Sequence, residues 1–156
     1  SEAALVARVV ADLSSEGHLV SIDTYKAPVA EAALAAGAEL VNDISGLTLG
    51  PGAAAAARDA GAGYVLNYSY SVPKRRPDQP PLYEDVVVDT VAWMEQRLDE
   101  LQSAGLPRDT IAIDPGIAFG KSHDEDIQVV RRCGELRTFA AAQQAQDERH
   151  QRDGAE

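Results

Sequence analysis

The fold is decided by a phrase that occurs twice in the sequence, as AGAELVN over residues 36–42 and as AGAGYVLN over residues 60–67. Each copy follows an alanine-rich helical stretch, turns at a glycine, continues in a short apolar run and ends on asparagine. The copies lie about 25 residues apart, which is the length of one strand–helix unit and shorter than most solenoid repeats. The consensus of leucine-rich repeats is absent. The phrase therefore predicts successive βα units.

Two further runs share this pattern, HLVSID over residues 18–23 and TIAID over residues 110–114. Short runs rich in Val and Ile between helical stretches are typical of buried parallel strands. In a barrel of βα units, the carboxyl ends of the strands line one common mouth where catalytic groups collect. The sequence therefore predicts that the polar residues ending the four runs meet at one pocket. These residues are Asp23, Asn42, Asn67 and Asp114.

The residues between the runs predict helices over 2–15, 26–36, 51–60 and about 83–104, and a last helix capped by Ser122 or Asp124 and running through residue 137. In the first helix the apolar residues with helical spacing are Leu5, Val6, Val9, Val10 and Leu13. The proline-rich loop over 69–83 has the length of a lid or binding loop. We predict one domain over residues 1–139 and a polar tail over 140–156.

Composition restricts the partners. The chain has 156 residues and a net charge of −11, with 25 acidic against 14 basic residues, so we expect neither nucleic acid nor membrane as a partner. The one basic run covers residues 74–76. A single cysteine, Cys133, and the lack of a basic signal sequence or long apolar stretch predict a cytoplasmic protein. We expect Cys133 to be a half-buried packing residue. The three histidines lack ligand-like spacing, so no protein metal site is predicted.

The stretch IDPGIAFGK over residues 113–121 carries the most specific chemistry. A strand delivers Asp114 to its end, Pro115 and Gly116 turn the chain, and Phe119 and Lys121 return beside the carboxylate. A carboxylate kept from water needs hydrogen-bond donors or a cation. The edge of a pterin or guanine, an amino group next to a ring N–H, offers two such donors. The alternative is an Asp114 that only caps the turn or pairs with Lys121.

Asp23 and Asn42 allow two interpretations each. At the end of a strand facing the mouth, Asp23 could offset positive charge developing on a substrate, although aspartate is also a common helix N-cap. Asn42 offers a donor and an acceptor to a heterocycle, although the Asn-Asp-x-Ser-Gly sequence is also typical of a turn. Their equivalent places in successive units favour the first interpretation for both.

Three stretches together resemble the successive signatures of dihydropteroate synthase: SIDTYK over residues 21–26, VNDISGL over 41–47 and IDPGIAFGK over 113–121. The resemblance implies an α/β fold of the (β/α)8 TIM-barrel type, of which only about four βα units are present. It implies a transferase that condenses a dihydropterin-CH2-pyrophosphate with p-aminobenzoate in folate biosynthesis.

The resemblance also implies roles for single residues. Asp23 and Asp114 would be catalytic, and the pterin would be held by Asp23, Asn42, Ile44 and Asp114. The p-aminobenzoate side would be formed by Phe119, Lys121 and Tyr68. Asn67 and Tyr68 stand where the family often has His followed by Met or Trp, and Ala118 replaces a common glycine.

The family's segments for Mg²⁺ and pyrophosphate have no counterpart in the 156 residues, so Mg²⁺ is expected from the family but its ligand segment is not seen here. An eight-stranded barrel needs about 250 residues. We therefore expect a fragment that is inactive alone and self-associates, as a homodimer or larger assembly. Two alternatives stay open: a non-catalytic, degenerate or truncated paralogue that acts by association, and a methyltetrahydrofolate-binding methyltransferase barrel, which the Phe119 turn disfavours.

Overall fold

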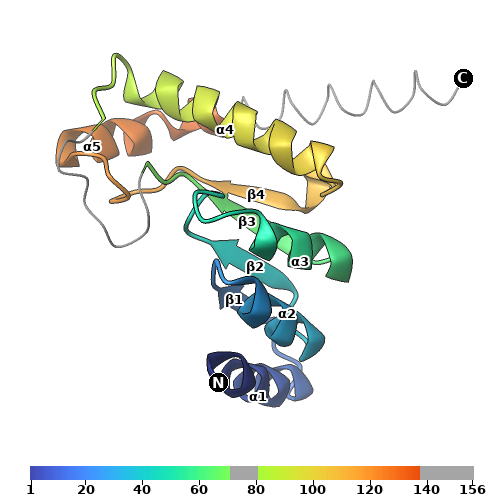
Figure 1. Ribbon diagram of the computed structural model, residues 1–156. Coiled ribbons are helices and arrows are strands. Elements are labelled where there is room, and N and C mark those ends of the chain that lie inside the picture. Colours follow the sequence, from blue (N-terminus) through green and yellow to red (C-terminus); the bar gives the residue numbers. More distant parts are fainter. Residues whose placement is uncertain (71–80, 138–156) are drawn as a thin grey trace, which may run out of the picture.

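The computed structural model describes residues 1–70 and 81–137 of the chain. Helices and strands alternate along it (Figure 1), in the order α1 (Glu2–Ser15), β1 (Ser21–Asp23), α2 (Ala27–Ala35), β2 (Leu40–Asp43), α3 (Gly52–Ala60), β3 (Gly63–Asn67), α4 (Val86–Ser103), the 3-10 helix η1 (Arg108–Thr110), β4 (Ile111–Asp114) and α5 (His123–Arg131). Residues 133–137 are again helical. The basic run at 74–76 and the tail predicted at 140–156 lie outside the described ranges, so the domain boundary at residue 139 stays a prediction.

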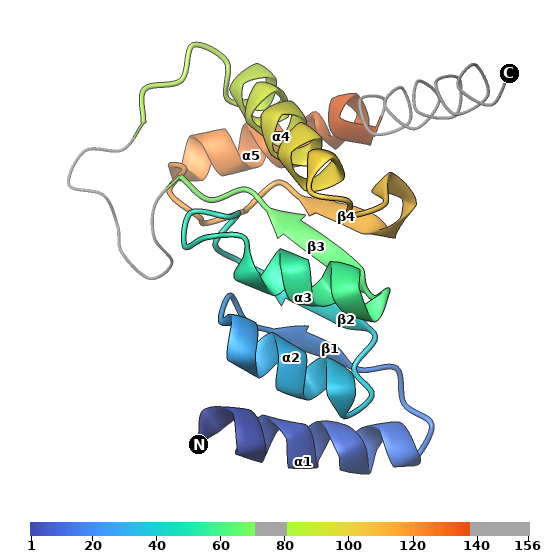
Figure 2. The ribbon, with the colours of Figure 1, turned by 45° about the vertical axis from the view of Figure 1, so that its right-hand side comes forward.

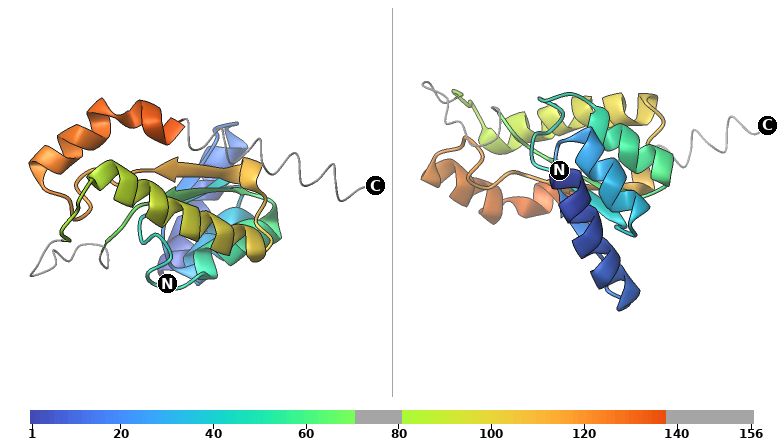
Figure 3. Two further views of the ribbon diagram at one scale, coloured as in Figure 1. Left: turned by 90° about the horizontal axis from the view of Figure 1, so that it is seen from above. Right: turned by 60° about the horizontal axis from the view of Figure 1, so that its bottom comes forward.

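The four strands form one parallel sheet in the order β1-β2-β3-β4. Helices α1, α2 and α3 lie side by side along one face of it (Figure 2). Helix α5 packs against α4 through Val86, Val87 and Val129, and α1 extends away from this pair of helices (Figure 3, right). The predicted series of four βα units in a parallel sheet is therefore confirmed.

The core lies between the sheet and its helices. Val41, Tyr64 and Leu66 point from the strands into it and are fully buried. Small side chains on α2 and α3 let these helices approach the sheet closely, and α4 contributes longer apolar side chains. The helical members of this core are Ala30, Ala53, Ala54, Ala56, Ala57, Met94, Leu98 and Leu101.

The opposite face of the sheet is open, and we call it the inner face. Because side chains along a strand alternate between the two faces, the strand register assigns every second residue to it. Several of its members are exposed, since four strands cannot enclose the interior that eight would. The inner face consists of Ser21, Asp23, Leu40, Asn42, Gly63, Val65, Asn67, Ala112 and Asp114.

The apolar residues of α1 are largely exposed, and one sequence prediction about burial, that for Cys133, is wrong. In α1, Val10 is buried, but Leu5, Val9 and Leu13 are 64%, 52% and 39% exposed, because α1 lies at the end of the row of helices and packs with one face against α2 and the β1 region. Cys133 is exposed rather than half-buried. Cys133 follows Arg132, the residue at which the helix is interrupted. The guanidinium group of Arg132 donates hydrogen bonds to both carboxylate oxygens of Asp85, the N-cap of α4, at 2.8 Å.

Candidate functional site

The polar residues that end the four strands lie at one end of the sheet and on its inner face. Asp23 pairs with Asn42 in the register of β1 and β2, and Asn67 pairs with Asp114 in that of β3 and β4. Asn42 pairs with Val65, so Asn67 lies two residues, about 6.6 Å, further along β3. We call this staggered set the polar rim. Stagger of this kind accompanies the strand tilt of a barrel.

Asp23 and Asn42 are in contact across the first two strands. Asn42 Nδ2 donates a hydrogen bond to Asp23 Oδ2 at 3.4 Å. The N-cap of α2 is Lys26, whose N–H bonds to Thr24 Oγ1 at 3.1 Å, so Asp23 is not a helix cap. Both polar side chains are therefore placed to meet a ligand at this end of the sheet.

The turn after β2 is formed by Asp43, which leaves Asn42 on the inner face. Asp43 is fully buried and accepts hydrogen bonds from Ser45 N–H and from the hydroxyl of Tyr64, both at 2.7 Å. Burial and the Asp43 carboxylate raise the pKa of Tyr64 above its usual range. The turn-forming role that the sequence allowed for Asn42 thus belongs to the residue after it.

Asn67 has a different role from the other rim residues. It is 1% exposed, and its Nδ2 donates to the carbonyl oxygens of Ile44 at 3.3 Å and Tyr68 at 2.8 Å. Its amide therefore fixes the backbone that carries Ile44, a half-buried residue predicted to pack on the pterin ring. The structure brings Asn67 to the rim as a support for its neighbours.

The carboxylate of Asp114 is oriented by its own turn. Oδ1 accepts a hydrogen bond from Gly116 N–H at 2.8 Å, and the Asp114 carbonyl accepts one from Tyr68 N–H at 2.8 Å. Across residues 1–70 and 81–137, no side chain or backbone group donates to the second oxygen, Oδ2, and the side chain is exposed. The protein thus fixes one oxygen of an exposed carboxylate and leaves the other without a donor in these ranges.

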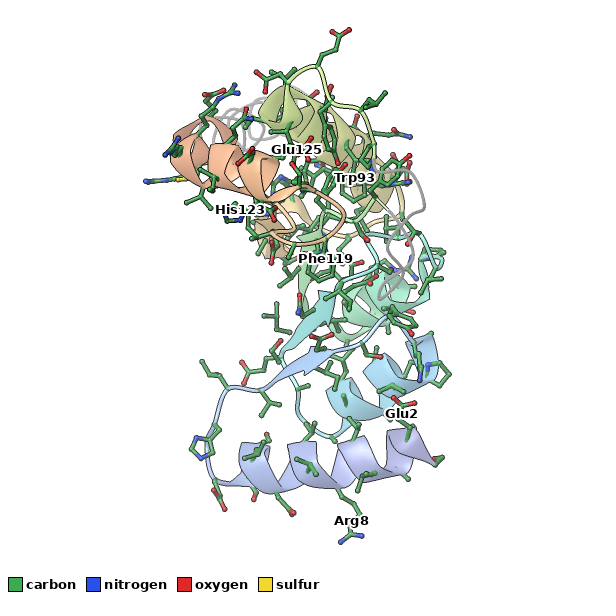
Figure 4. All side chains as sticks on the ribbon, turned by 90° about the vertical axis from the view of Figure 1, so that its left-hand side faces the viewer. Glu2, Arg8, Trp93, Phe119, His123 and Glu125 are labelled. Carbon is green, nitrogen blue, oxygen red and sulfur yellow. The ribbon has the colours of Figure 1, made fainter. Side chains whose placement is uncertain are left out.

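The residues predicted to form the p-aminobenzoate side lie around this turn. Phe119 is half-buried on the loop between β4 and α5 (Figure 4), with its N–H bonded to the Gly116 carbonyl at 3.1 Å. Lys121 points inward: it is 9% exposed, and its Nζ donates to the carbonyl of Pro115 at 2.7 Å. The same Nζ lies 3.7 Å from the centre of the Tyr68 ring.

Tyr68 belongs to an aromatic cluster that the sequence did not reveal. Its hydroxyl and that of Tyr83 are 2.8 Å apart, and its ring meets Trp93 edge-on at 4.9 Å. Tyr68 is 3% exposed. Trp93 lies on α4 (Figure 4), so the cluster joins the end of β3 to α4, and its Tyr68 ring also receives Lys121 from the loop that carries Phe119. The only local signal was the tyrosines flanking the proline-rich loop.

Lys121 predicts an unusual pH dependence of stability. Burial lowers its pKa to about 8, from about 10.5 in the unfolded chain. Between these values the unfolded chain binds the extra proton, so the free energy of unfolding should rise as the pH increases from 8 to 10, by about 2 kcal/mol. Urea denaturation across this range measures it, and Lys121→Met should abolish the rise. A flat profile in the wild type would contradict the prediction. Above pH 10 the buried tyrosines, whose pKa is raised, oppose the trend.

Magnesium stays a prediction from the family resemblance. Within the described part of the chain, no group of three His, Cys, Asp or Glu side chains is arranged to hold a metal ion. The described residues alone therefore do not fit a protein-held Mg²⁺. In the same ranges, no helix has the length and apolarity needed to cross a membrane.

The sequence matches the family described as "Pterin binding enzyme" over residues 1–145. It is 36% identical over 135 residues to the dihydropteroate synthase of Mycobacterium leprae, covering 86% of this chain and 48% of that protein. It is 32% identical over 136 residues to the dihydropteroate synthase of Neisseria meningitidis serogroup C, with the same two coverages. The chain thus spans about half the length of these relatives.

Solved structures agree with this match. The Yersinia pestis dihydropteroate synthase, solved with a sulfonamide drug, superposes with a TM-score of 0.79 at 32% identity, over 86% of this chain and 48% of that one. The Thermus thermophilus enzyme in complex with 4-aminobenzoate gives 0.74 at 34% identity, over 85% and 50%. The Burkholderia cenocepacia enzyme with 7,8-dihydropteroate gives 0.71 at 38% identity, over 80% and 44%. The chain belongs to the pterin binding enzyme family, as a partial TIM barrel of the dihydropteroate synthase type.

Proposed function

We propose that this chain forms the pterin-binding part of a dihydropteroate synthase, an enzyme that joins a dihydropterin to p-aminobenzoate. One observation carries the proposal. Asp114, fixed through one carboxylate oxygen by its own turn, lies at the same end and on the same face of the sheet as Asp23 and Asn42. The solved relatives that hold 4-aminobenzoate and 7,8-dihydropteroate support it through their likeness to this chain.

Asp114 would bind the pterin through the edge that carries the amino group and a ring N–H. Both groups are donors, and a carboxylate can accept both at once. The bond from Gly116 N–H already fixes the rotation of the carboxylate, which lowers the entropy lost on binding. Asn42 would contact a second edge of the heterocycle, and Ile44 would pack against its face.

Asp23 would act on the reacting methylene group. In the reaction the bond from this carbon to pyrophosphate breaks first, and pyrophosphate leaves with the electron pair. The pterin-methyl cation is then attacked by the aryl amine, which forms the new C–N bond and loses a proton. A carboxylate near the cation lowers the barrier electrostatically, without accepting a proton. Phe119 would flank the amine substrate, supported by Tyr68 and Lys121 beneath it.

We expect the 156 residues alone to bind a dihydropterin but to form no dihydropteroate at a useful rate. Their four strands provide one wall of a barrel, and a wall that binds the pterin cannot replace the missing stabilisation of the leaving pyrophosphate. A coupled assay for pyrophosphate release with the pure chain measures this. Release well above the blank, abolished by Asp114→Asn, would show that this part of the prediction is wrong.

We also propose that the chain self-associates. Strands β1 and β4 end the sheet within the described ranges, and α1 exposes Leu5, Val9 and Leu13 along one stripe. Unpaired strand edges and exposed apolar stripes favour association. We expect a dimer or larger species in light scattering at micromolar concentration. Val9→Glu should shift it toward the monomer, whereas Ala11→Glu should not, because it adds the same charge at an exposed position about 200° around the helix from Val9. A compact wild-type monomer would contradict the proposal.

A cytoplasmic location is part of the proposal as well. The exposed thiol of Cys133 supports it, because reducing compartments keep such thiols free. Fractionation of cells that produce the protein would test it, and recovery in an oxidising compartment would contradict it.

A further inference from the structure

Lys121 is a buried cation at the end of a loop, and its surroundings are unusual for a lysine. The ammonium group donates to the carbonyls of Pro115 at 2.7 Å and Gly116 at 3.3 Å, and it lies over the face of the Tyr68 ring. Lysines are almost never fully buried unless they are paired. Within residues 1–70 and 81–137, no carboxylate oxygen lies within 4 Å of the Lys121 ammonium group. The partners of this ammonium group are two backbone carbonyl groups and an aromatic ring.

The groups that Lys121 holds belong to the turn of Asp114. The Pro115 carbonyl belongs to the same peptide group as the Gly116 N–H that fixes Asp114 Oδ1, and the Gly116 carbonyl belongs to the next peptide group. The Tyr68 ring under the ammonium belongs to the residue whose N–H bonds the Asp114 carbonyl. The side chain of Lys121 thus connects the two backbone segments that orient the carboxylate of Asp114.

We propose that Lys121 is a positioning residue, whose buried ammonium group holds the Asp114 turn in the conformation that receives the pterin. The inference rests on the proposed function for its ligand, and it assigns Lys121 to the turn rather than to the carboxylate of p-aminobenzoate. A charged donor binds carbonyl groups and an aromatic face more strongly than a neutral amine does. Charge is therefore what the position requires, although burying it opposes folding.

The charge of Lys121 thus has opposite effects on positioning and on folding stability, and this difference makes the proposal testable. Burial lowers the pKa of Lys121 to about 8, so the charge can be removed within an accessible pH range. The other charged groups that act on it come from the strand and from the adjacent helix, and all are carboxylates. They are Asp114 of β4 and Glu125 and Asp126 of α5. The phenol of Tyr68, the residue after β3, stays protonated in this range because burial raises its pKa.

The first experiment needs no ligand. The amide resonance of Gly116 in ¹⁵N-labelled protein should titrate with a midpoint near pH 8 in the wild type. It should not titrate in Lys121→Met, and it should still titrate in Lys26→Met, which removes an exposed lysine bound to Glu2. The same spectra show whether each variant is folded. If the Gly116 resonance does not change with the charge of Lys121, the proposal is wrong, whether or not the pterin binds.

The second experiment measures dihydropterin affinity by calorimetry at pH 7 and pH 9. We expect Lys121→Met to bind about tenfold more weakly than the wild type at pH 7, with an unfolding midpoint at least as high. Between pH 7 and 9 the affinity of the wild type should fall by more than the affinity of Lys121→Met. The variant serves as the reference because titration of the ligand itself affects both proteins equally. The proposal is wrong if the wild type and Lys121→Met bind the dihydropterin equally at pH 7. It is also wrong if Lys121→Met loses stability in parallel with affinity. If no protein binds the pterin while the Gly116 titration is present, the proposed function fails and the link between Lys121 and the turn stands.

Discussion

Replacing Gly116 with alanine should cost about 3 kcal/mol or more of unfolding free energy and remove pterin binding. Gly116 has φ +68°, in the left-handed region that disfavours side chains. A β-carbon there would overlap the carbonyl oxygen of Tyr68. That backbone cannot withdraw, because the Tyr68 N–H is bonded to the Asp114 carbonyl. The substitution therefore forces apart β3 and β4 at the point where they carry the site.

Gly17→Ala is the matched control for this prediction. Gly17 has φ +83° but no atom lies within 4 Å of the β-carbon that it would gain. Its substitution should cost only the conformational term, about 1 kcal/mol. Urea denaturation of the two variants separates steric overlap from backbone strain. Similar losses for both would show that the close approach of Gly116 to Tyr68 does not determine the stability of this turn.

Asp114→Asn should weaken the binding of a dihydropterin tenfold to a hundredfold. The amide replaces one acceptor oxygen with a donor, so one donor of the pterin edge meets another donor. Losing a charged hydrogen-bond partner costs about 1.5–3 kcal/mol. The turn itself should persist, since the remaining carbonyl oxygen can still accept from Gly116 N–H.

The control for the charge is Asp59→Asn. Asp59 lies on α3, its side chain is 68% exposed, and it pairs with the neighbouring Arg58 at 2.7 Å. Both variants remove one negative charge, so a general electrostatic effect would affect them equally. Calorimetric titration at one ionic strength should show wild-type affinity for Asp59→Asn. Equal affinities of all three proteins would mean that Asp114 is only a turn residue.

The order of elements and the polar rim were predictable from the sequence because both follow from local patterns. Apolar runs that end in a polar residue indicate a strand and its carboxyl end, and parallel strands bring those ends together. Asp23, Asn42 and Asp114 lie at one end of the sheet for this reason. The repeated phrase located β2 and β3, whose register places Asn42 beside Val65.

The rest depends on contacts between segments that are distant in the chain. Lys121 follows a glycine in a loop, and nothing nearby indicates that its ammonium lies over Tyr68, 53 residues earlier. The burial of Asn67 requires the carbonyl of Ile44 on a neighbouring loop. The exposure of Leu5 and Val9 depends on what packs beside α1, which helical periodicity cannot specify. Pattern predicts which face of a helix is apolar, but the neighbours decide whether that face is buried.

The central claim, that the polar rim binds a pterin, is tested most directly by mapping the ligand on the protein. Titration of ¹⁵N-labelled chain with a dihydropterin should shift the amide resonances of Thr24, Asp43 and Gly116, which lie at or just beyond the carboxyl ends of β1, β2 and β4. The amides around Asp59, on the outer surface of α3, should not move. Saturable shifts confined to the rim are the predicted result. No saturable shift, or shifts confined to the helical face, would contradict the account.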